Sequence, residues 1–198
     1  DKGLIILAEK YNSYTYTTTT YQAGSGTMPG RWTTTTYQVY ECGDIMMSKI
    51  DAAGNIGWLN IAPKQQREVI QTGSRSGTGL SFSFFRVWFN WPFYAGYGVL
   101  PGSNSLNIIL NDHKKNDNVL QLGQKVKKIS YFRKSECFAI NLNTTTGKYT
   151  RSNLFSNRDV PTAMPRLSSV LGRDMYLIGK EDRILGKTKI AVARLTIK

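Results

Sequence analysis

The chain has little of the side-chain chemistry on which most metal and nucleophilic sites depend. Its 198 residues include one histidine, His113, and two cysteines, Cys42 and Cys137. A structural zinc site takes four Cys or His ligands, and a nucleophilic serine or cysteine needs an imidazole beside it. His113 stands in a polar stretch, 111–116, where we expect an exposed turn rather than a catalytic base. The sequence therefore predicts no metal, no cofactor and no catalytic residue.

Acidic residues are also scarce. The chain has 13 Asp and Glu against 26 Lys and Arg, which gives a net charge of +13, and such an excess attracts polyanions. The densest basic stretch covers 125–134 and a second covers 180–198, and we read both as strands with polar outer faces. Nucleic-acid binders usually concentrate their charge on one element. Nucleic acid is therefore not the expected partner, although a basic polyanion or nucleic-acid binder stays open as an alternative.

The few carboxylates leave one catalytic alternative. Glycoside hydrolysis needs two carboxyl groups that flank the scissile bond. Most acidic residues here stand at turns, but Glu9, Glu41 and Asp44 begin or end strands of one expected sheet and could converge. A glycoside hydrolase fragment therefore remains a second alternative.

Long hydrophobic runs are missing as well. No apolar run approaches the roughly 20 residues of a transmembrane helix, and no secretory leader is recognisable. The chain begins at Asp1 without Met and enters an apolar run at once. We therefore expect a mature form or a fragment of a longer protein.

What the chain does contain is typical of β-structure. Its 18 Gly, 11 Tyr and long Thr runs favour strands and tight turns over helices. Two predicted turns match, with Asp51 and Asn143 in equivalent places and Gly54 and Gly147 able to supply a positive φ. Short apolar strands are predicted at 3–10, 105–112 and 174–180, and their partner strands at 44–51, 136–143 and 189–195.

This layout predicts the architecture. A sheet of this kind cannot bury both faces alone, so it stacks on copies of itself, as the blades of a propeller do. We predict an all-β chain of repeated antiparallel sheets, β-propeller-like, either a single domain over 1–198 or part of a larger propeller. Its approximate units are 1–70, 71–170 and 171–198. The first strands lie about 100 and then about 70 residues apart, wider than in familiar propeller families, so a β-sandwich or barrel is the alternative.

The insertion in the first unit has features of its own. Thr- and Tyr-rich runs at 14–21 and 33–37 flank a Gly/Pro loop at 24–30, which predicts a long hairpin. Residues 63–70 are the one segment where we expect a short helix. A loop is expected to follow over 72–79.

An aromatic run between Phe82 and Tyr97 contains more rings than one sheet face can bury. Pro92 indicates an edge or a loop there. Exposed Trp and Tyr rings stack on sugars or anchor protein partners, whereas core packing between sheets is the alternative for the same rings. The candidate ligand-binding residues are Trp88, Trp91, Tyr94 and Tyr97.

Several short motifs resemble those of a group of uncharacterised exported bacterial proteins with β-propeller-like repeats. The resemblance spans roughly residues 4–143, and it carries over no catalytic residue. It implies an exported protein, secreted, periplasmic or on the cell surface, in which a disulfide between Cys42 and Cys137 becomes possible. The motifs are Leu7-Ala8-Glu9, Asp44-Ile45, Lys49-Ile50-Asp51, Gly54-Asn55-Ile56-Gly57-Trp58, Pro63-Lys64-Gln65-Gln66 and Leu110-Asn111-Asp112-His113-Lys114-Lys115-Asn116.

The sequence thus favours an exported, non-enzymatic β-repeat protein that presents a binding surface for a glycan or a protein.

Overall fold

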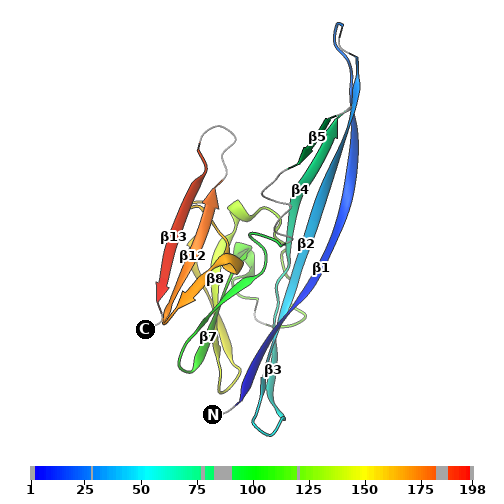
Figure 1. Cartoon of the computed structure of the whole chain (residues 1–198). Coiled ribbons are helices and arrows are strands. Elements are labelled where there is room, and N and C mark those ends of the chain that lie inside the picture. Colours follow the sequence, from blue (N-terminus) through cyan, green and yellow to red (C-terminus); the bar gives the residue numbers. More distant parts are fainter. Residues whose placement is uncertain are drawn as a thin grey trace.

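The computed structural model describes residues 3–27, 29–76, 79–82, 91–119, 121–181 and 187–196 (Figure 1). Over these residues the chain forms strands, turns and three short 3-10 helices, and no α-helix. The strands make three antiparallel sheets, and none of them closes on itself. The prediction of an all-β chain with several antiparallel sheets is confirmed. None of the helices within the described residues has the length and apolar character needed to cross a lipid bilayer.

The first sheet is dominated by a long hairpin of β1 and β2, which runs to Gln22 opposite Arg31 near its tip. Figure 1 shows the upper part of this hairpin projecting beyond the rest of the molecule. Thr residues face one another across it, and the rings of Tyr16 and Tyr37 stack with centroids 5.1 Å apart. The predicted hairpin is therefore confirmed. The strands of this sheet are β1 (Leu4–Gln22), β2 (Arg31–Ile50), β3 (Ile56–Ala62), β4 (Gln66–Ser76) and β5 (Gly79–Phe82), in the order β1-β2-β4-β5 with β3 also paired to β2.

The second and third sheets are smaller. In the second sheet the strands follow one another in chain order, and in the third β12 is paired on both sides. The second sheet contains β6 (Tyr97–Pro101), β7 (Ser105–Asp112), β8 (Glu136–Asn143) and β9 (Tyr149–Ser156), and the third contains β10 (Thr162–Ala163), β11 (Ser169–Leu171), β12 (Asp174–Glu181) and β13 (Lys189–Thr196). The 3-10 helices are η1 (Lys114–Asn116), η2 (Phe132–Lys134) and η3 (Pro165–Leu167).

The second sheet lies between the other two and is buried on both faces. One core cluster joins it to the first sheet and a second cluster joins it to the third. Alternate residues of one strand serve both clusters, since Ile108 and Leu110 pack toward the first sheet and Ile109 toward the third. The first cluster contains Ile45, Met47, Ala62, Ile108, Leu110, Ile140 and Leu142, and the second contains Leu100, Ile109, Cys137, Ala139, Ala163, Met175 and Leu177.

The six strand segments predicted from the apolar pattern are all strands. Each first strand pairs with its predicted partner, β1 with β2, β7 with β8 and β12 with β13. The two predicted turns are alike in detail: the side chain of Asp51 accepts hydrogen bonds from the backbone of Ala53 and Asn55, and Asn143 accepts from Thr145 and Thr146. Descent of these units from one repeat, and their membership of a propeller, remain predictions.

The helix predicted over 63–70 is wrong. Residues 66–76 form β4, which pairs with β2 over ten residues from Gln66 opposite Cys42 to Ser76 opposite Thr33. Burial alternates along its start, with Gln66, Glu68 and Ile70 turned inward. Pairing with β2 gives this segment backbone hydrogen bonds and one buried face. These tertiary interactions outweigh the local preference for helix.

Two neighbouring predictions also need correction. The loop expected over 72–79 is strand as far as Ser76, strand resumes at Gly79, and residues 77–78 lie outside the described residues. The basic stretch 125–134, expected as a strand, is instead a loop that ends in η2. Its one strand-like contact is a parallel bridge between Ile129 and Gln66.

The two cysteines are not bonded to each other. Both are free and buried, Cys137 in the cluster between the second and third sheets and Cys42 in a small cluster with Ala95, Ile129 and Phe132. The disulfide that the resemblance made possible is therefore not present in this structure.

Candidate functional site

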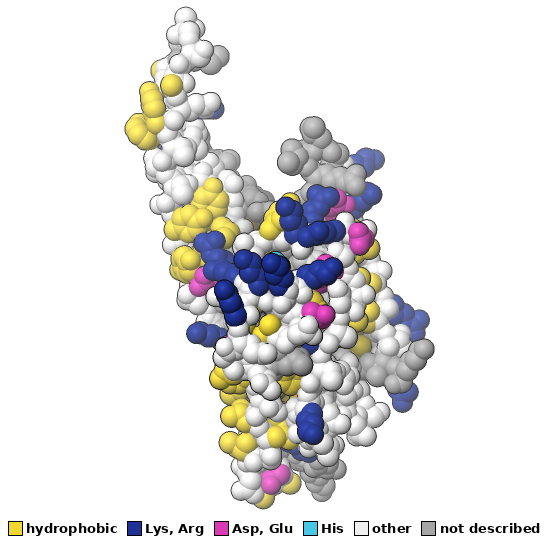
Figure 2. Space-filling model, turned by 180° about the vertical axis from the view of Figure 1, so that it is seen from behind, with side chains coloured by type: hydrophobic (Ala, Val, Ile, Leu, Met, Phe, Trp, Pro, Cys, Tyr) yellow, Lys and Arg dark blue, Asp and Glu magenta, His cyan; other side chains and the backbone are white. Residues whose placement is uncertain are grey.

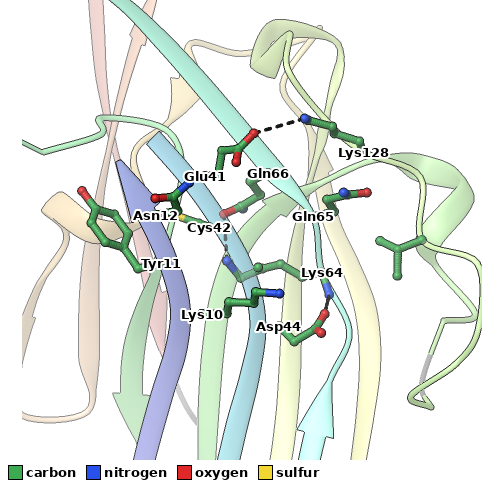
Figure 3. A pocket seen from close by; sticks show the side chains of 12 residues that line it. Lys10, Tyr11, Asn12, Glu41, Cys42, Asp44, Lys64, Gln65, Gln66 and Lys128 are labelled. Atoms are coloured by element: carbon green, nitrogen blue, oxygen red, sulfur yellow. Dashed lines mark hydrogen bonds and ion pairs between the residues drawn. The ribbon is translucent and has the colours of Figure 1, made fainter. Parts of the chain in front are cut away.

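The first sheet is interrupted halfway along its length, and the interruption opens a pocket. The pairing of β1 with β2 shifts register between Glu9 and Tyr11, and β2 exchanges its partner β4 for β3 across Gly43 and Asp44. A pocket of about 550 Å³ lies at this point (Figure 3). It is lined by Lys10, Tyr11, Asn12, Glu41, Cys42, Gly43, Asp44, Lys64, Gln65, Gln66, Val126 and Lys128.

A buried lysine forms the floor of the pocket. The side chain of Lys64 is fully shielded from solvent, and its ammonium contacts the Glu9 carboxylate and donates to Oε1 of Gln66 over 2.9 Å. Gln66 in turn donates to the carbonyl of Asn111 over 2.6 Å and accepts from the amide of Gly96 over 2.7 Å. Burial lowers the pKa of Lys64, and the Glu9 carboxylate opposes that shift.

The three carboxylates predicted to converge do so around this pocket. Glu41 and Asp44 line it, and Glu9 lies behind Lys64. Each is already engaged: both oxygens of Glu9 are bound by cations, one by Lys64 and the other by Arg166 over 2.6 Å, and Asp44 accepts from the backbone amide of Lys64 over 3.0 Å.

Glu41 is held by two cations at the mouth of the pocket. Its Oε1 lies 3.4 Å from Nζ of Lys128 and 3.8 Å from Nε of Arg67. A hydrolytic pair needs one carboxyl group that donates a proton and another that attacks or activates water. In this structure Glu9 and Glu41 are counter-ions to cations, and Asp44 is an acceptor for a backbone amide.

The rim of the pocket carries side chains with unused hydrogen-bonding capacity. Lys10, Asn12 and Gln65 are exposed, and among the described residues none forms a hydrogen bond or an ion pair with their side chains. Gly43 leaves room for the lysine stem, because a Cβ at this position would stand 3.2 Å from Cβ of Lys10. In Figure 3 the Lys10 side chain lies beside those of Lys64 and Asp44.

Tyr11 belongs to the pocket lining, but its ring points away from the other lining side chains (Figure 3). Its side chain is partly exposed, and the Arg166 guanidinium lies 5.9 Å from its ring centroid. Partial burial raises the pKa of the phenol, so the hydroxyl stays protonated at neutral pH and can donate a hydrogen bond.

A basic band borders the pocket. Figure 2 shows Lys and Arg side chains gathered across the back of the molecule, level with the middle of the first sheet. Segment 125–128 lies beside η1, because the amide of Lys127 donates to the Asn116 side chain and its carbonyl accepts from it. Lys128 reaches Glu41 at the pocket mouth. The exposed cations of these two segments are Lys114, Lys115, Lys125, Lys127 and Lys128.

The four residues of the predicted aromatic site do not share one environment. Trp88 lies outside the described residues, and the side chain of Trp91 is 57% exposed. Tyr94 stacks on Phe132 with centroids 5.9 Å apart, and Tyr97 packs against the core between the first and second sheets. The structure does not bring Tyr94, Tyr97 and Trp91 together on one open face.

His113 has a structural task. It precedes η1, where its Nδ1 accepts a hydrogen bond from the backbone of Lys115 over 3.0 Å. The adjacent Asp112 is buried and pairs with Arg151. Its carboxylate accepts a hydrogen bond from the backbone amide of His113, not from the imidazole. Within the described residues no group of three His, Cys, Asp or Glu side chains is arranged to hold a metal ion.

Sequence reasoning missed Lys64 and the amide side chains on the rim. One local signal was available: the Pro63-Lys64-Gln65-Gln66 stretch separates two segments that contain β-branched residues, 56–62 and 67–72. A proline at this place indicates a break between two strands. The burial of Lys64 depends on Glu9 and Arg166, which are remote from it in the sequence, so no local pattern announces it.

No protein-family model, no curated protein and no solved structure matches the chain. The resemblance to exported propeller-like proteins therefore stays a prediction.

Proposed function

We propose that the protein is a non-catalytic binding protein whose pocket in the first sheet takes one unit of an acidic glycan. The observation that carries this proposal is the set of exposed, unpartnered polar side chains around a pocket whose floor is fixed by buried hydrogen bonds. Lys10, Asn12 and Gln65 are free to bind a ligand as far as the described residues go, whereas Lys64 and Gln66 are committed to the protein.

The chemistry of the rim suits a sugar. Saccharide hydroxyl groups both donate and accept, and amide side chains such as those of Asn12 and Gln65 do the same. The volume of about 550 Å³ falls in the usual range of small-ligand pockets.

The charge of the surroundings favours an acidic sugar over a neutral one. Lys10 stands at the opening without a counter-ion among the described residues, and the exposed lysines of the basic band continue from the pocket mouth. A carboxylate or sulfate on the bound unit would neutralise Lys10, and further acidic units would lie along the band.

The ion-paired state of the carboxylates supports a binding role over hydrolysis. Glu9 has a cation on each oxygen, and Glu41 lies between two cations. Both oxygens of Glu9 are occupied, and the two cations beside Glu41 both lie at its Oε1, so these carboxylates are engaged as counter-ions.

The test compares an acidic with a neutral oligosaccharide by calorimetry, with tetragalacturonate and cellotetraose as probes. We expect binding of tetragalacturonate and little binding of cellotetraose. Lys10→Gln removes a charge-assisted hydrogen bond, worth roughly 1.5–3 kcal/mol, and should weaken binding about tenfold or more. Asn12→Ala should weaken it less.

Two control variants separate the pocket from the alternatives. Trp91→Ala tests the exposed ring of the predicted aromatic site, and Lys189→Gln removes an exposed charge from the third sheet. If Lys189→Gln weakens binding as much as Lys10→Gln, and added salt abolishes both effects alike, the chain is a general polyanion binder and the pocket proposal is wrong. A loss specific to Trp91→Ala would move the site to the aromatic run.

We further propose that the three sheets are successive blades of a β-propeller-like stack and that the protein is exported. The burial of the second sheet on both faces supports the stack. An acidic glycan is an extracellular ligand in most settings, which supports export. Protease accessibility of the protein on intact cells, compared with lysed cells, tests the second point.

A further inference from the structure

Within the described residues, no other element packs on one apolar face of each of the two outer sheets of the stack. In the first sheet, Met47 and its cross-strand neighbour Leu7 face the core, so the residues that alternate with them face outward. Leu4, Met46 and Leu59 on this outward face are 60%, 38% and 54% exposed. Figure 2 shows hydrophobic side chains gathered at the bottom of the molecule, where Figure 1 places β3. The apolar residues of this outer face are Leu4, Ile6, Met46, Ile50, Leu59 and Ile61.

The third sheet has a corresponding face. Met175 and Leu177 pack against the second sheet, so Tyr176 and Ile178 face the other way. Val192 lies opposite Ile178 and Ile190 opposite Lys180, and both are well exposed, at 63% and 70%. The apolar residues of this outer face are Leu171, Tyr176, Ile178, Ile190 and Val192.

The uncovered faces continue an arrangement that already exists within the chain. The first sheet packs on one face of the second sheet, and the opposite face of the second sheet packs on the third. The two clusters that join successive sheets are thus filled mainly by aliphatic side chains from β-strands. The outer face of the third sheet also carries Lys180 and the Asp174–Arg194 ion pair, but its aliphatic side chains resemble those that fill the two clusters, as do those of the first sheet's outer face.

We propose that these two faces bind each other between two copies of this chain. The third sheet of one copy packs against the first sheet of its partner, in the same manner as the sheets within a copy. Such a contact joins unlike surfaces, so it closes only when the partner returns the same contact. Two copies bring six sheets, which lies within the range of four to eight in closed propellers, and no apolar face then remains exposed to water at either end.

The first test is the mass of the protein in solution, by sedimentation or light scattering after size exclusion. We expect twice the 22.3 kDa of a single chain. A protein that stays a monomer at its highest soluble concentration overturns the proposal. A mass that keeps growing with concentration overturns the closed pair.

Charged substitutions on the two faces test the pairing of unlike surfaces. Leu59→Asp alters the outer face of the first sheet and Val192→Asp that of the third, and both positions are exposed enough for the single chain to fold, which circular dichroism checks. Each variant alone should be monomeric. An equal mixture of the two should form a mixed dimer, because one copy retains an intact first-sheet face and the other an intact third-sheet face.

Association between like faces predicts a different pattern. One of the two variants would then remain dimeric on its own, and mixing the two variants would produce no additional dimer. This result overturns the proposal. Leu154→Asp is the matched control, since Leu154 is an exposed apolar residue of β9 that lies on neither outer face. This variant should have the mass of the unaltered protein.

Discussion

The ammonium group of Lys64 contacts the carboxylate of Glu9, which lies 55 residues earlier in the chain. Both side chains are shielded from solvent. Arg166, in η3 between β10 and β11, binds the second oxygen of the same carboxylate. One acidic residue of β1 therefore neutralises two cations from distant parts of the sequence. This contact holds the interrupted part of the first sheet against η3.

Glu9→Gln is expected to destabilise the protein strongly. It leaves the ammonium of Lys64 buried without a carboxylate and also removes the partner of Arg166. Loss of one partner from a buried ion pair costs about 3–5 kcal/mol. Lys64→Met should cost less, because Glu9 then keeps Arg166 and the methionine stem replaces the apolar part of lysine. Urea unfolding measures both, and equal losses would contradict this division of roles.

Asp112 and Arg151 form a second buried pair, with the guanidinium 4.5 Å from the Phe138 ring centroid. Asp112→Asn should destabilise by about 3–5 kcal/mol, because Arg151 remains buried and charged. The control is Arg133→Gln, which breaks the more exposed pair with Glu181 and should cost about 0.2–1 kcal/mol. Thermal unfolding at neutral pH compares them, and a similar shift in Tm for both variants would argue against a special role for burial.

Alkaline pH should destabilise the fold through its buried thiols. Burial raises the pKa of both Cys42 and Cys137 to about 12. The unfolded thiols ionise near pH 8.5 whereas the folded ones keep their protons, so the folded state binds more protons and stability falls as pH rises from about 9 toward 12. Each thiol contributes a slope of up to about 1.4 kcal/mol per pH unit.

The variant Cys137→Ala should therefore show a shallower loss of stability above pH 9 than the unaltered protein, although its stability at pH 7 is lower because a cavity is created. The native protein should also resist alkylation by iodoacetamide at both cysteines until it is unfolded. Rapid labelling of the folded protein would mean that the two clusters open readily.

The hairpin and the paired strands could be predicted because their signals are local. Thr- and Tyr-rich runs on both sides of a Gly/Pro loop favour two strands and their turn, and the short apolar runs at 105–112 and 174–180 with turn-rich flanks favour strands over helices. The strand at 66–76 could not be predicted in this way. Its register with β2 is set by residues more than 20 positions away, such as Cys42 opposite Gln66.

The pocket was beyond sequence reasoning for a related reason. It exists because β1 bulges after Glu9 at the same level at which β2 changes partner near Gly43. The bulge has no local sequence signature, and the partner change is marked only by the Pro63-Lys64-Gln65-Gln66 stretch. The convergence of Glu9 and Asp44 was expected from predicted strand ends, although both residues lie within the longer strands β1 and β2. Their engagement by Lys64 could not be predicted, since it depends on two strands and on the link between β3 and β4.

The two matched turns give a last prediction, because their glycines differ only in surroundings. Gly54 and Gly147 have φ values of 89° and 74°, so alanine at either position pays about 1–2 kcal/mol for a left-handed backbone. A Cβ on Gly54 meets nothing within 4 Å, whereas one on Gly147 would stand 2.6 Å from the Trp58 ring and 2.8 Å from the Asn60 amide.

Gly147→Ala should therefore cost about 1–3 kcal/mol more than Gly54→Ala, the usual penalty of overpacking. The Trp58 ring belongs to β3, so the extra cost measures how tightly the first sheet docks on the β8–β9 turn, where Asn60 also donates to the Gly147 carbonyl over 2.9 Å. Urea unfolding of both variants, repeated with Trp58→Leu in each, isolates that contact as a double-mutant cycle. With the ring removed, the two alanine variants should lose similar stability. A difference that persists would place the constraint in the turn backbone itself.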